Sequence, residues 1–128
     1  MSLVRYLPRV GEPNPTDNPV YTCSDTDIVV PQHPNADPFA WAKKCAEVRT
    51  ITHILIPGRA FDSHGARVGN GGGWYDRFLS TVPREWVRVG VLFDHQLSAM
   101  PLTQQPWDQR MDELLVKGSN DWHKVVVD

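Results

Sequence analysis

The sequence has few of the features that mark exported, membrane-spanning or nucleic-acid-binding proteins. It holds two cysteines in 128 residues, Cys23 and Cys45, and without metal-site spacing we expect both to be free thiols. No apolar run is long enough to cross a membrane, and the first residues lack the basic and apolar pattern of a leader, so we expect an unexported protein. The net charge of -2 offers no general field for a polyanion. We therefore expect a cytoplasmic protein without nucleic-acid or membrane partners.

Two common nucleotide-binding motifs are also absent. A Walker loop needs Gly-Lys followed by Ser or Thr, whereas the glycine run of this chain ends in Trp74. A dinucleotide fingerprint with the spacing G-x-G-x-x-G needs glycine at that same position. Any nucleotide site must therefore use another loop.

Proline is concentrated at the beginning of the chain, where seven of the eleven prolines lie in the first 38 residues. This density excludes a regular helix and predicts that residues 1–36 are irregular or extended, with strand pieces around 4–7 and 28–30. We expect this part to have little core of its own. Its section 12–19 is interpreted as a mobile linker or as an arm that packs on a partner.

The rest of the chain alternates between helix and strand signals. Asp37 followed by Pro38 predicts a helix start, and that helix is apolar around most of its circumference, so we expect it to be buried. The further predicted elements are a strand at 51–56, a helix at 74–81 ended by Pro83, a strand at 87–93 and a terminal strand near 124–127. This order predicts one α/β domain over 1–128, with a mostly parallel sheet and flanking helices.

Four of the nine glycines lie between Arg67 and Arg77, at the predicted strand-to-helix turn. Glycine lets the backbone take positive φ and approach a ligand closely, so successive N–H groups converge on an anion. The simpler alternative is a tight turn that only packs a helix on a sheet. The flanking charges favour a phosphate-binding loop, which would lie at the carboxyl end of a strand, where open α/β sheets place ligands.

The run from Ile56 to Leu79 resembles the signature of the 5-formyltetrahydrofolate cyclo-ligase family, also called methenyltetrahydrofolate synthetases. The strand at 87–93 and the segment from Trp107 to Leu115 resemble the rest of that family's C-terminal half, so the resemblance covers roughly 52–116. It implies conversion of 5-formyltetrahydrofolate to 5,10-methenyltetrahydrofolate with MgATP as co-substrate, releasing ADP and phosphate. Phosphoryl transfer asks a protein mainly to position phosphates and neutralise charge, which suits a glycine loop.

The resemblance also implies residue roles. Arg67 and Tyr75 would be catalytic, and Asp76 and Asp108 would bind Mg²⁺. ATP would be bound by Arg67, Val68, Gly69, Asn70, Gly71, Gly72, Gly73, Trp74 and Tyr75. The formyl-folate would be bordered by Asn70, Gly71, Gly72, Gly73 and Trp74.

Each charged role has a simpler alternative. Asp76 is favourable at a helix start for dipole reasons alone, and Asp108 is common in a turn such as Pro106-Trp107-Asp108. For Arg67 the simpler alternative is a solvated surface cation, although an arginine beside glycines is well suited to bidentate contact with phosphate.

The chain departs from the family pattern in three respects. Asn70 stands where members commonly carry a second arginine, and Trp74 replaces the first of two tyrosines. Members are also longer at the N-terminus, where a helical segment supplies a lysine and an arginine to ATP, so this chain resembles an N-terminally truncated member. Two hypotheses remain: a cyclo-ligase whose site is completed by a homodimer, or a non-catalytic nucleotide- or folate-binding relic. We expect a homodimer because truncation exposes surface.

Overall fold

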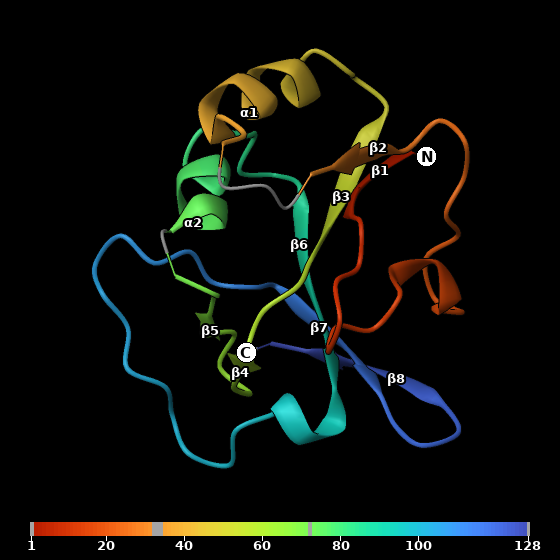
Figure 1. The fold of residues 1–128 in the computed structure, drawn as a ribbon, viewed down its shortest axis with the longest axis vertical. Helices are drawn as coiled ribbons and strands as arrows, with labels where there is room; N and C mark the ends of the chain where they lie inside the picture. The colour runs from red at the N-terminus through yellow and green to blue at the C-terminus, as the bar shows by residue number, and fades with distance from the viewer. Residues whose placement is uncertain (1, 32–34, 72, 128) are drawn as a thin grey trace.

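The computed structural model describes residues 2–31, 35–71 and 73–127. Within these residues the fold is built on a six-stranded sheet, whose arrangement can be followed in Figure 1. The strand order is β2-β1-β3-β6-β7-β8; all neighbours are parallel except β7 and β8. The strands are β1 (Ser2–Tyr6), β2 (Ile28–Val30), β3 (Ile51–Ile56), β6 (Val87–Phe93), β7 (Glu113–Lys117) and β8 (Trp122–Val126). The predicted α/β class with a mostly parallel sheet is confirmed, although β7 was not predicted.

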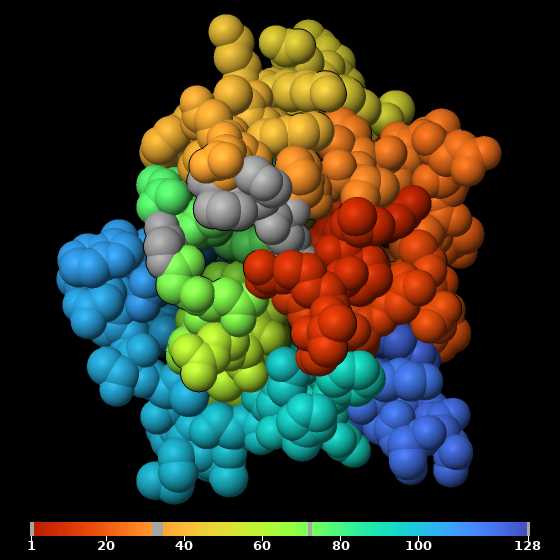
Figure 2. Space-filling view, viewed as in Figure 1, coloured from red at the N-terminus to blue at the C-terminus, as the bar shows by residue number. Residues whose placement is uncertain are grey.

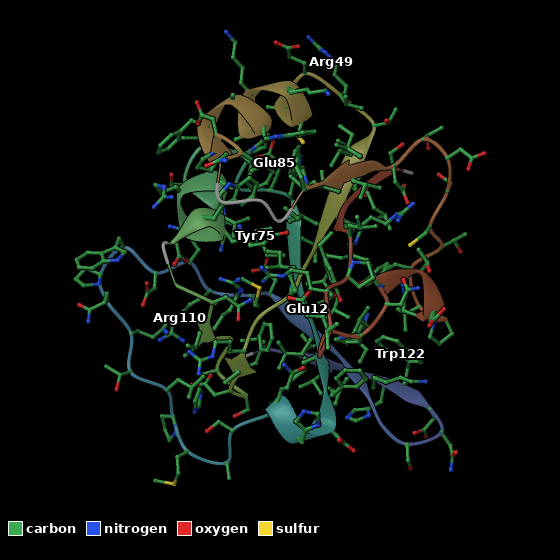
Figure 3. The ribbon with its side chains drawn as sticks, viewed as in Figure 1. Glu12, Arg49, Tyr75, Glu85, Arg110 and Trp122 are labelled. Carbon is green, nitrogen blue, oxygen red and sulfur yellow. The ribbon has the colours of Figure 1, made fainter. Side chains whose placement is uncertain are left out.

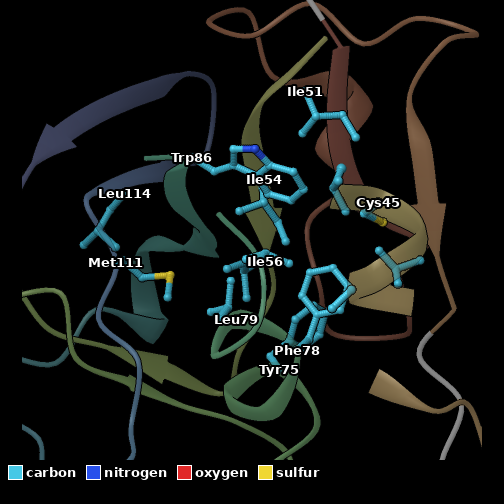
Figure 4. Packing of buried hydrophobic residues seen from close by; sticks show 14 of the residues in the cluster. Cys45, Ile51, Ile54, Ile56, Tyr75, Phe78, Leu79, Trp86, Met111 and Leu114 are labelled. Atoms are coloured by element: carbon cyan, nitrogen blue, oxygen red, sulfur yellow. The ribbon is translucent and has the colours of Figure 1, made fainter. Parts of the chain in front are cut away.

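Two helices, α1 (Pro38–Ala46) and α2 (Trp74–Leu79), pack on one face of this sheet. Between them and the strands lies a core that we call the helix-side core, and Figure 4 shows part of it. Ile54 and Ile56 of β3 face it, while Leu55 between them faces the opposite side, as the two-residue period of a strand requires. The far-side core on that opposite face consists of Leu3, Tyr6, Leu55, Val89, Val91 and Leu115.

The first part of the chain is more integrated than its proline content predicted. β1 lies between β2 and β3, and its Leu3, Val4 and Tyr6 are fully buried. The prediction of little core in this part was therefore wrong. Residues 12–19 are no free linker either, because they contain the short 3-10 helix η1 (Pro15–Asp17) and the Tyr6 hydroxyl donates to the Pro13 carbonyl at 2.5 Å.

The predicted helix start at Asp37 is confirmed, since its carboxylate accepts the N–H groups of Phe39 and Ala40 at 2.9 and 3.3 Å. The prediction that this helix is buried around most of its circumference was wrong, because only Pro38, Ala42 and Cys45 of α1 are buried. The helix lies on the surface of a two-layer structure, so one stripe is enough to cover the sheet. No helix in the described ranges is long and apolar enough to span a membrane.

A small hairpin separates β3 from the glycine run. It consists of β4 (Ala60–Phe61) and β5 (Arg67–Val68), which pair antiparallel. Phe61 packs directly over Gly90 of β6, where an added Cβ would lie 2.5 Å from the ring. The glycine run therefore follows β5 and leads into α2, a strand-to-helix turn as predicted. It does not follow a strand of the main sheet, because the hairpin is inserted there.

Candidate functional site

A cavity of about 530 Å³ lies beside the hairpin. Its lining residues are Arg9, Arg67, Val68, Gly69, Asn70, Gly71, Gly73, Trp74, Tyr75, Asp76, Thr103, Trp107 and Asp108. On the face shown in Figure 2, the red N-terminal segment adjoins the yellow-green hairpin region, and the blue loop borders that region on its other side. Three distant segments of the chain thus meet at one cavity, and nearly all site residues predicted from the sequence line it.

Two glycines of the glycine run have the positive φ that its composition predicted. Gly71 and Gly73 have φ of +96° and +64°, in the left-handed region that favours glycine, and Gly73 is the N-cap of α2. At Gly69, an added Cβ would lie 3.1 Å from a guanidinium nitrogen of Arg67. The loop is thus folded closely against this arginine. Gly72, which was also predicted to bind ATP and to border the formyl-folate, lies outside the described residues.

Arg67 is fixed in place on the wall of the cavity. Its Nε donates to the Pro57 carbonyl at 2.6 Å, and its guanidinium carbon lies 5.1 Å from the centre of the Tyr75 ring. Burial lowers the pKa of Arg67, while Tyr75 and the carboxylates around the cavity raise it. An arginine stays charged in proteins, so the loop carries an oriented cation.

Tyr75 contributes an unused polar group. The residue is 6% exposed, and its hydroxyl has no hydrogen-bond partner in the described part of the chain. Burial raises the pKa of this hydroxyl well above its ordinary value of 10.0, although Arg67 lowers it. The neutral phenol is therefore a donor at physiological pH. A buried polar group without a partner is costly, so a ligand that accepted this hydrogen bond would be favoured.

Asp76 and Asp108 line the same cavity, and a hydrogen bond joins the Asp76 carboxylate to the residue that follows Asp108. Asp76 Oδ1 accepts the N–H of Gln109 at 3.0 Å, so the first turn of α2 holds the loop that contains Asp108. Asp108 Oδ2 accepts the N–H of Gln105 at 2.7 Å and closes the predicted turn. Within residues 2–31, 35–71 and 73–127, no group of three or more His, Cys, Asp or Glu side chains is arranged to hold a metal ion.

A buried arginine that the sequence did not single out supports this pair. Arg88 of β6 is 3% exposed, and its Nη1 donates to Gln109 Oε1 at 2.6 Å while its Nη2 donates to the Leu79 carbonyl at 3.1 Å. Burial lowers the pKa of Arg88. The guanidinium therefore orients Gln109, whose backbone in turn holds Asp76.

Sequence reasoning also missed three residues of the cavity wall: Arg9, Thr103 and Trp107. Arg9 belongs to the proline-rich start of the chain, and Trp107 is 67% exposed in a long loop. No local pattern distinguishes either residue, because only the tertiary fold brings them to the glycine loop. For Trp107 the available signals were the expected turn at 106–108 and the family resemblance of the segment that begins with it.

Curated proteins similar to this chain are cyclo-ligases. The 5-formyltetrahydrofolate cyclo-ligase of Mycoplasma genitalium is 35% identical over 68 residues, which are 53% of this chain and 40% of that protein. The cyclo-ligase of Mycoplasma pneumoniae is 29% identical over 93 residues, 72% of this chain and 50% of that protein. The chain thus spans half or less of the length of these relatives.

Solved structures show the same fold. A 5,10-methenyltetrahydrofolate synthetase from Mycoplasma pneumoniae aligns with a TM-score of 0.58 at 21% identity, covering 90% of this chain and 71% of that one. The synthetase of Aquifex aeolicus aligns with a TM-score of 0.55 at 22% identity, covering 97% and 71%. The profile of one protein family matches residues 7–117, which is most of the chain. The chain therefore belongs to the 5-formyltetrahydrofolate cyclo-ligase family.

Proposed function

We propose that this chain catalyses the ATP- and Mg²⁺-dependent conversion of 5-formyltetrahydrofolate to 5,10-methenyltetrahydrofolate, with release of ADP and phosphate. The observation that carries the proposal is the single cavity lined by the glycine loop, Arg67, Tyr75 and two carboxylates. Those groups are the kinds that phosphoryl transfer needs: backbone donors, a fixed cation and oxygen ligands.

The residues present fit a triphosphate. Gly69, Gly71 and Gly73 lack side chains that would keep phosphate oxygens from the backbone, and Arg67 is held in one orientation by Pro57 and Tyr75. A preoriented guanidinium loses little entropy when it binds, so it serves both to position the phosphates and to neutralise charge in the transition state. The buried Tyr75 hydroxyl supplies one further donor.

The donor set also fits Mg²⁺. This cation prefers oxygen ligands and is commonly bound by one or two carboxylates together with waters and substrate phosphates. Asp76 and Asp108 would supply the carboxylates. The hydrogen bond from the Gln109 N–H keeps the Asp76 carboxylate turned toward the loop that contains Asp108. Bound there, the cation would neutralise phosphate charge.

In the proposed reaction the formyl oxygen attacks the γ-phosphorus of ATP, and ADP leaves. The activated carbon is then attacked by the neighbouring folate nitrogen, which loses its proton, and phosphate leaves with the former formyl oxygen. Trp74 would border the folate; its indole Nε1 donates to the Ala36 carbonyl at 2.8 Å and its ring stacks on Phe78 at 5.4 Å. These two contacts fix the orientation of the Trp74 ring, and a fixed wall favours a near-attack geometry.

The activity test follows methenyl product spectrophotometrically after mixing protein, 5-formyltetrahydrofolate and MgATP. We expect product with the unaltered chain and none above background with Asp76→Ala, while the exposed Asp25→Ala control retains activity. Calorimetric titration with MgATP is done in parallel, and Arg67→Ala should weaken binding by about 1.5–3 kcal/mol, the range for a charge-assisted contact. Arg59→Ala, at an exposed arginine directly before the hairpin and outside the cavity lining, is the matched control.

Nucleotide binding without product would contradict catalysis by this chain and leave a binding protein. An unchanged affinity of Arg67→Ala would remove Arg67 from the phosphate site. The homodimer expected from the sequence stays a prediction, as does its role in completing the site.

A further inference from the structure

We propose that Arg9 is a second cation of the phosphate subsite, a role that rests on the proposed function and extends it to the N-terminal segment. Arg9 lines the same cavity as Arg67, from a different part of the chain. The glycine loop itself carries Asn70 between its glycines and so offers one fixed cation, Arg67, for a ligand with several negative charges. A cation from the facing segment would share that charge.

The backbone that carries Arg9 is firmly anchored. It follows β1, whose Tyr6 is fully buried and donates its hydroxyl to the Pro13 carbonyl at 2.5 Å. Between these two residues a turn is closed by the Glu12 N–H, which donates to the Arg9 carbonyl at 3.0 Å. The Arg9 N–H donates in return to Glu12 Oε1 at 2.8 Å. The position of Arg9 at the cavity is therefore set by the fold.

The side chain of Arg9, in contrast, is held loosely. Its Nη2 lies 3.4 Å from Glu12 Oε2, and its side chain is 47% exposed while that of Glu12 is 7% exposed. An ion pair of this length with one exposed member contributes little to stability, so replacing or supplementing it with a ligand phosphate costs little. A bidentate phosphate contact is stronger than the existing pair.

The charges of Arg9 and Glu12 already act on the Tyr75 hydroxyl at the cavity wall. Burial raises the pKa of Tyr75, Arg67 and Arg9 lower it, and Glu12 raises it. Glu12 also raises the pKa of Arg67. Figure 3 labels both Glu12 and Tyr75 near the middle of the view, and the charge of Glu12 acts on the Tyr75 hydroxyl. Arg9 and Arg67 thus act on the same buried hydroxyl, and an anion bound near that hydroxyl would feel both cations.

A purely structural role for Arg9 makes a different prediction. If Arg9 only closed its turn with Glu12, loss of either charge would have the same effect on the protein. If Arg9 binds phosphate, removing the Glu12 charge should strengthen binding, because a carboxylate near the anion is removed and the arginine is released. The two variants Arg9→Gln and Glu12→Gln therefore separate the two roles.

The experiment titrates inorganic tripolyphosphate, MgATP and 5-formyltetrahydrofolate, each alone, into the full chain and its variants by calorimetry. We expect Arg9→Gln to weaken tripolyphosphate and MgATP binding by about 10- to 100-fold. Glu12→Gln should bind both about two- to five-fold more tightly. Arg84→Gln, which loses an exposed ion pair with Asp112 outside the cavity, is the matched control and should bind like the unaltered chain. Thermal unfolding of each variant verifies that it is folded.

Equal affinity of Arg9→Gln and the unaltered chain for tripolyphosphate would overturn the role of Arg9, as would parallel losses in Arg9→Gln and Glu12→Gln. Selective weakening of 5-formyltetrahydrofolate would also overturn it, because the cation would then serve the folate carboxylates. Arg9-dependent tripolyphosphate binding without methenyl product would support the subsite and overturn the proposed reaction. A chain that binds none of the three ligands would overturn both.

Discussion

Among single residues, Arg88 shows how a buried charge can serve a site that it does not touch. Taking a guanidinium out of water is costly, and the cost falls when its donors find partners: Nη1 and Nη2 of Arg88 donate to the Gln109 side chain and the Leu79 carbonyl, whereas its buried Nε has no partner in the described part of the chain. Those partners belong to the loop that binds Asp76 and to the end of α2. We therefore infer that Arg88 is a positioning residue that keeps Asp76 and Asp108 facing one cavity.

Arg88→Met should test this inference. The variant leaves the buried Leu79 carbonyl and the half-buried Gln109 Oε1 without their donor, and we expect a loss of about 1–3 kcal/mol in the free energy of unfolding, measured with urea. If Arg88 positions the carboxylates, the Mg²⁺ concentration for half-maximal activity should also rise, and Arg88→Lys should partly restore it. Arg84→Met, at an exposed arginine, controls for loss of charge. A stability loss with unchanged Mg²⁺ dependence would limit Arg88 to packing.

At the scale of elements, Asp62 connects the hairpin to the long loop on the other side of the cavity. Its Oδ1 accepts the N–H groups of His64 and Ala66 at 2.9 and 3.0 Å, and its Oδ2 accepts that of Leu102 at 2.8 Å. The residue is 3% exposed. Three bonds to one carboxylate thus hold the turn before β5 and the start of the loop that carries Trp107 and Asp108.

Asp62→Asn should release this connection. The amide has one acceptor oxygen in place of two, so at least one backbone N–H loses its partner, and we expect the free energy of unfolding to fall by about 1.5–3 kcal/mol. Urea unfolding at pH 7 measures it. The exposed Asp25→Asn is the control, and an equal effect of the two substitutions would contradict this role of Asp62.

The pH dependence follows from the same carboxylate. Burial raises the pKa of Asp62, but the three backbone N–H groups outweigh it and leave the pKa below its ordinary value of 3.8. The stabilisation is therefore fully present above pH 3.8 and is lost as the pH falls through the lower folded-state pKa. Between pH 7 and pH 3, the unaltered chain should lose more stability than Asp62→Asn.

Sequence predicted the elements whose signals are local. The cap at Asp37 and the apolar run of β3 place both elements correctly, and Arg67, Tyr75 and Asp76 share one cavity because they are close in sequence. Asp108 lies far from these residues in sequence, and only the family resemblance predicted that it belongs to the same site. Burial of β1 depends on pairing with β2 and β3, which no local pattern contains.

In the whole molecule, the sheet separates two cores that differ in what covers them. The helix-side core lies under α1 and α2 and includes Cys45, whereas the far-side core is packed by partly buried residues that include Tyr21 and Cys23. Both cysteines are free thiols, as the sequence predicted. Each thiol therefore reports on the opening of a different layer.

We predict that a thiol reagent such as 5,5′-dithiobis(2-nitrobenzoate) labels Cys23 well before Cys45. Cys45 is fully buried, and burial raises its pKa to about 11, so its thiolate forms and meets reagent mainly when the helix layer opens. Cys23 is only half-buried.

Single-thiol variants, Cys23→Ser and Cys45→Ser, give the two rates separately, and urea-unfolded protein gives the limit for an accessible thiol. In Cys23→Ser, the labelling rate of Cys45 should depend on urea concentration in the same way as global unfolding does. A Cys45 rate near the unfolded limit in the absence of urea would show that α1 does not cover the sheet as described.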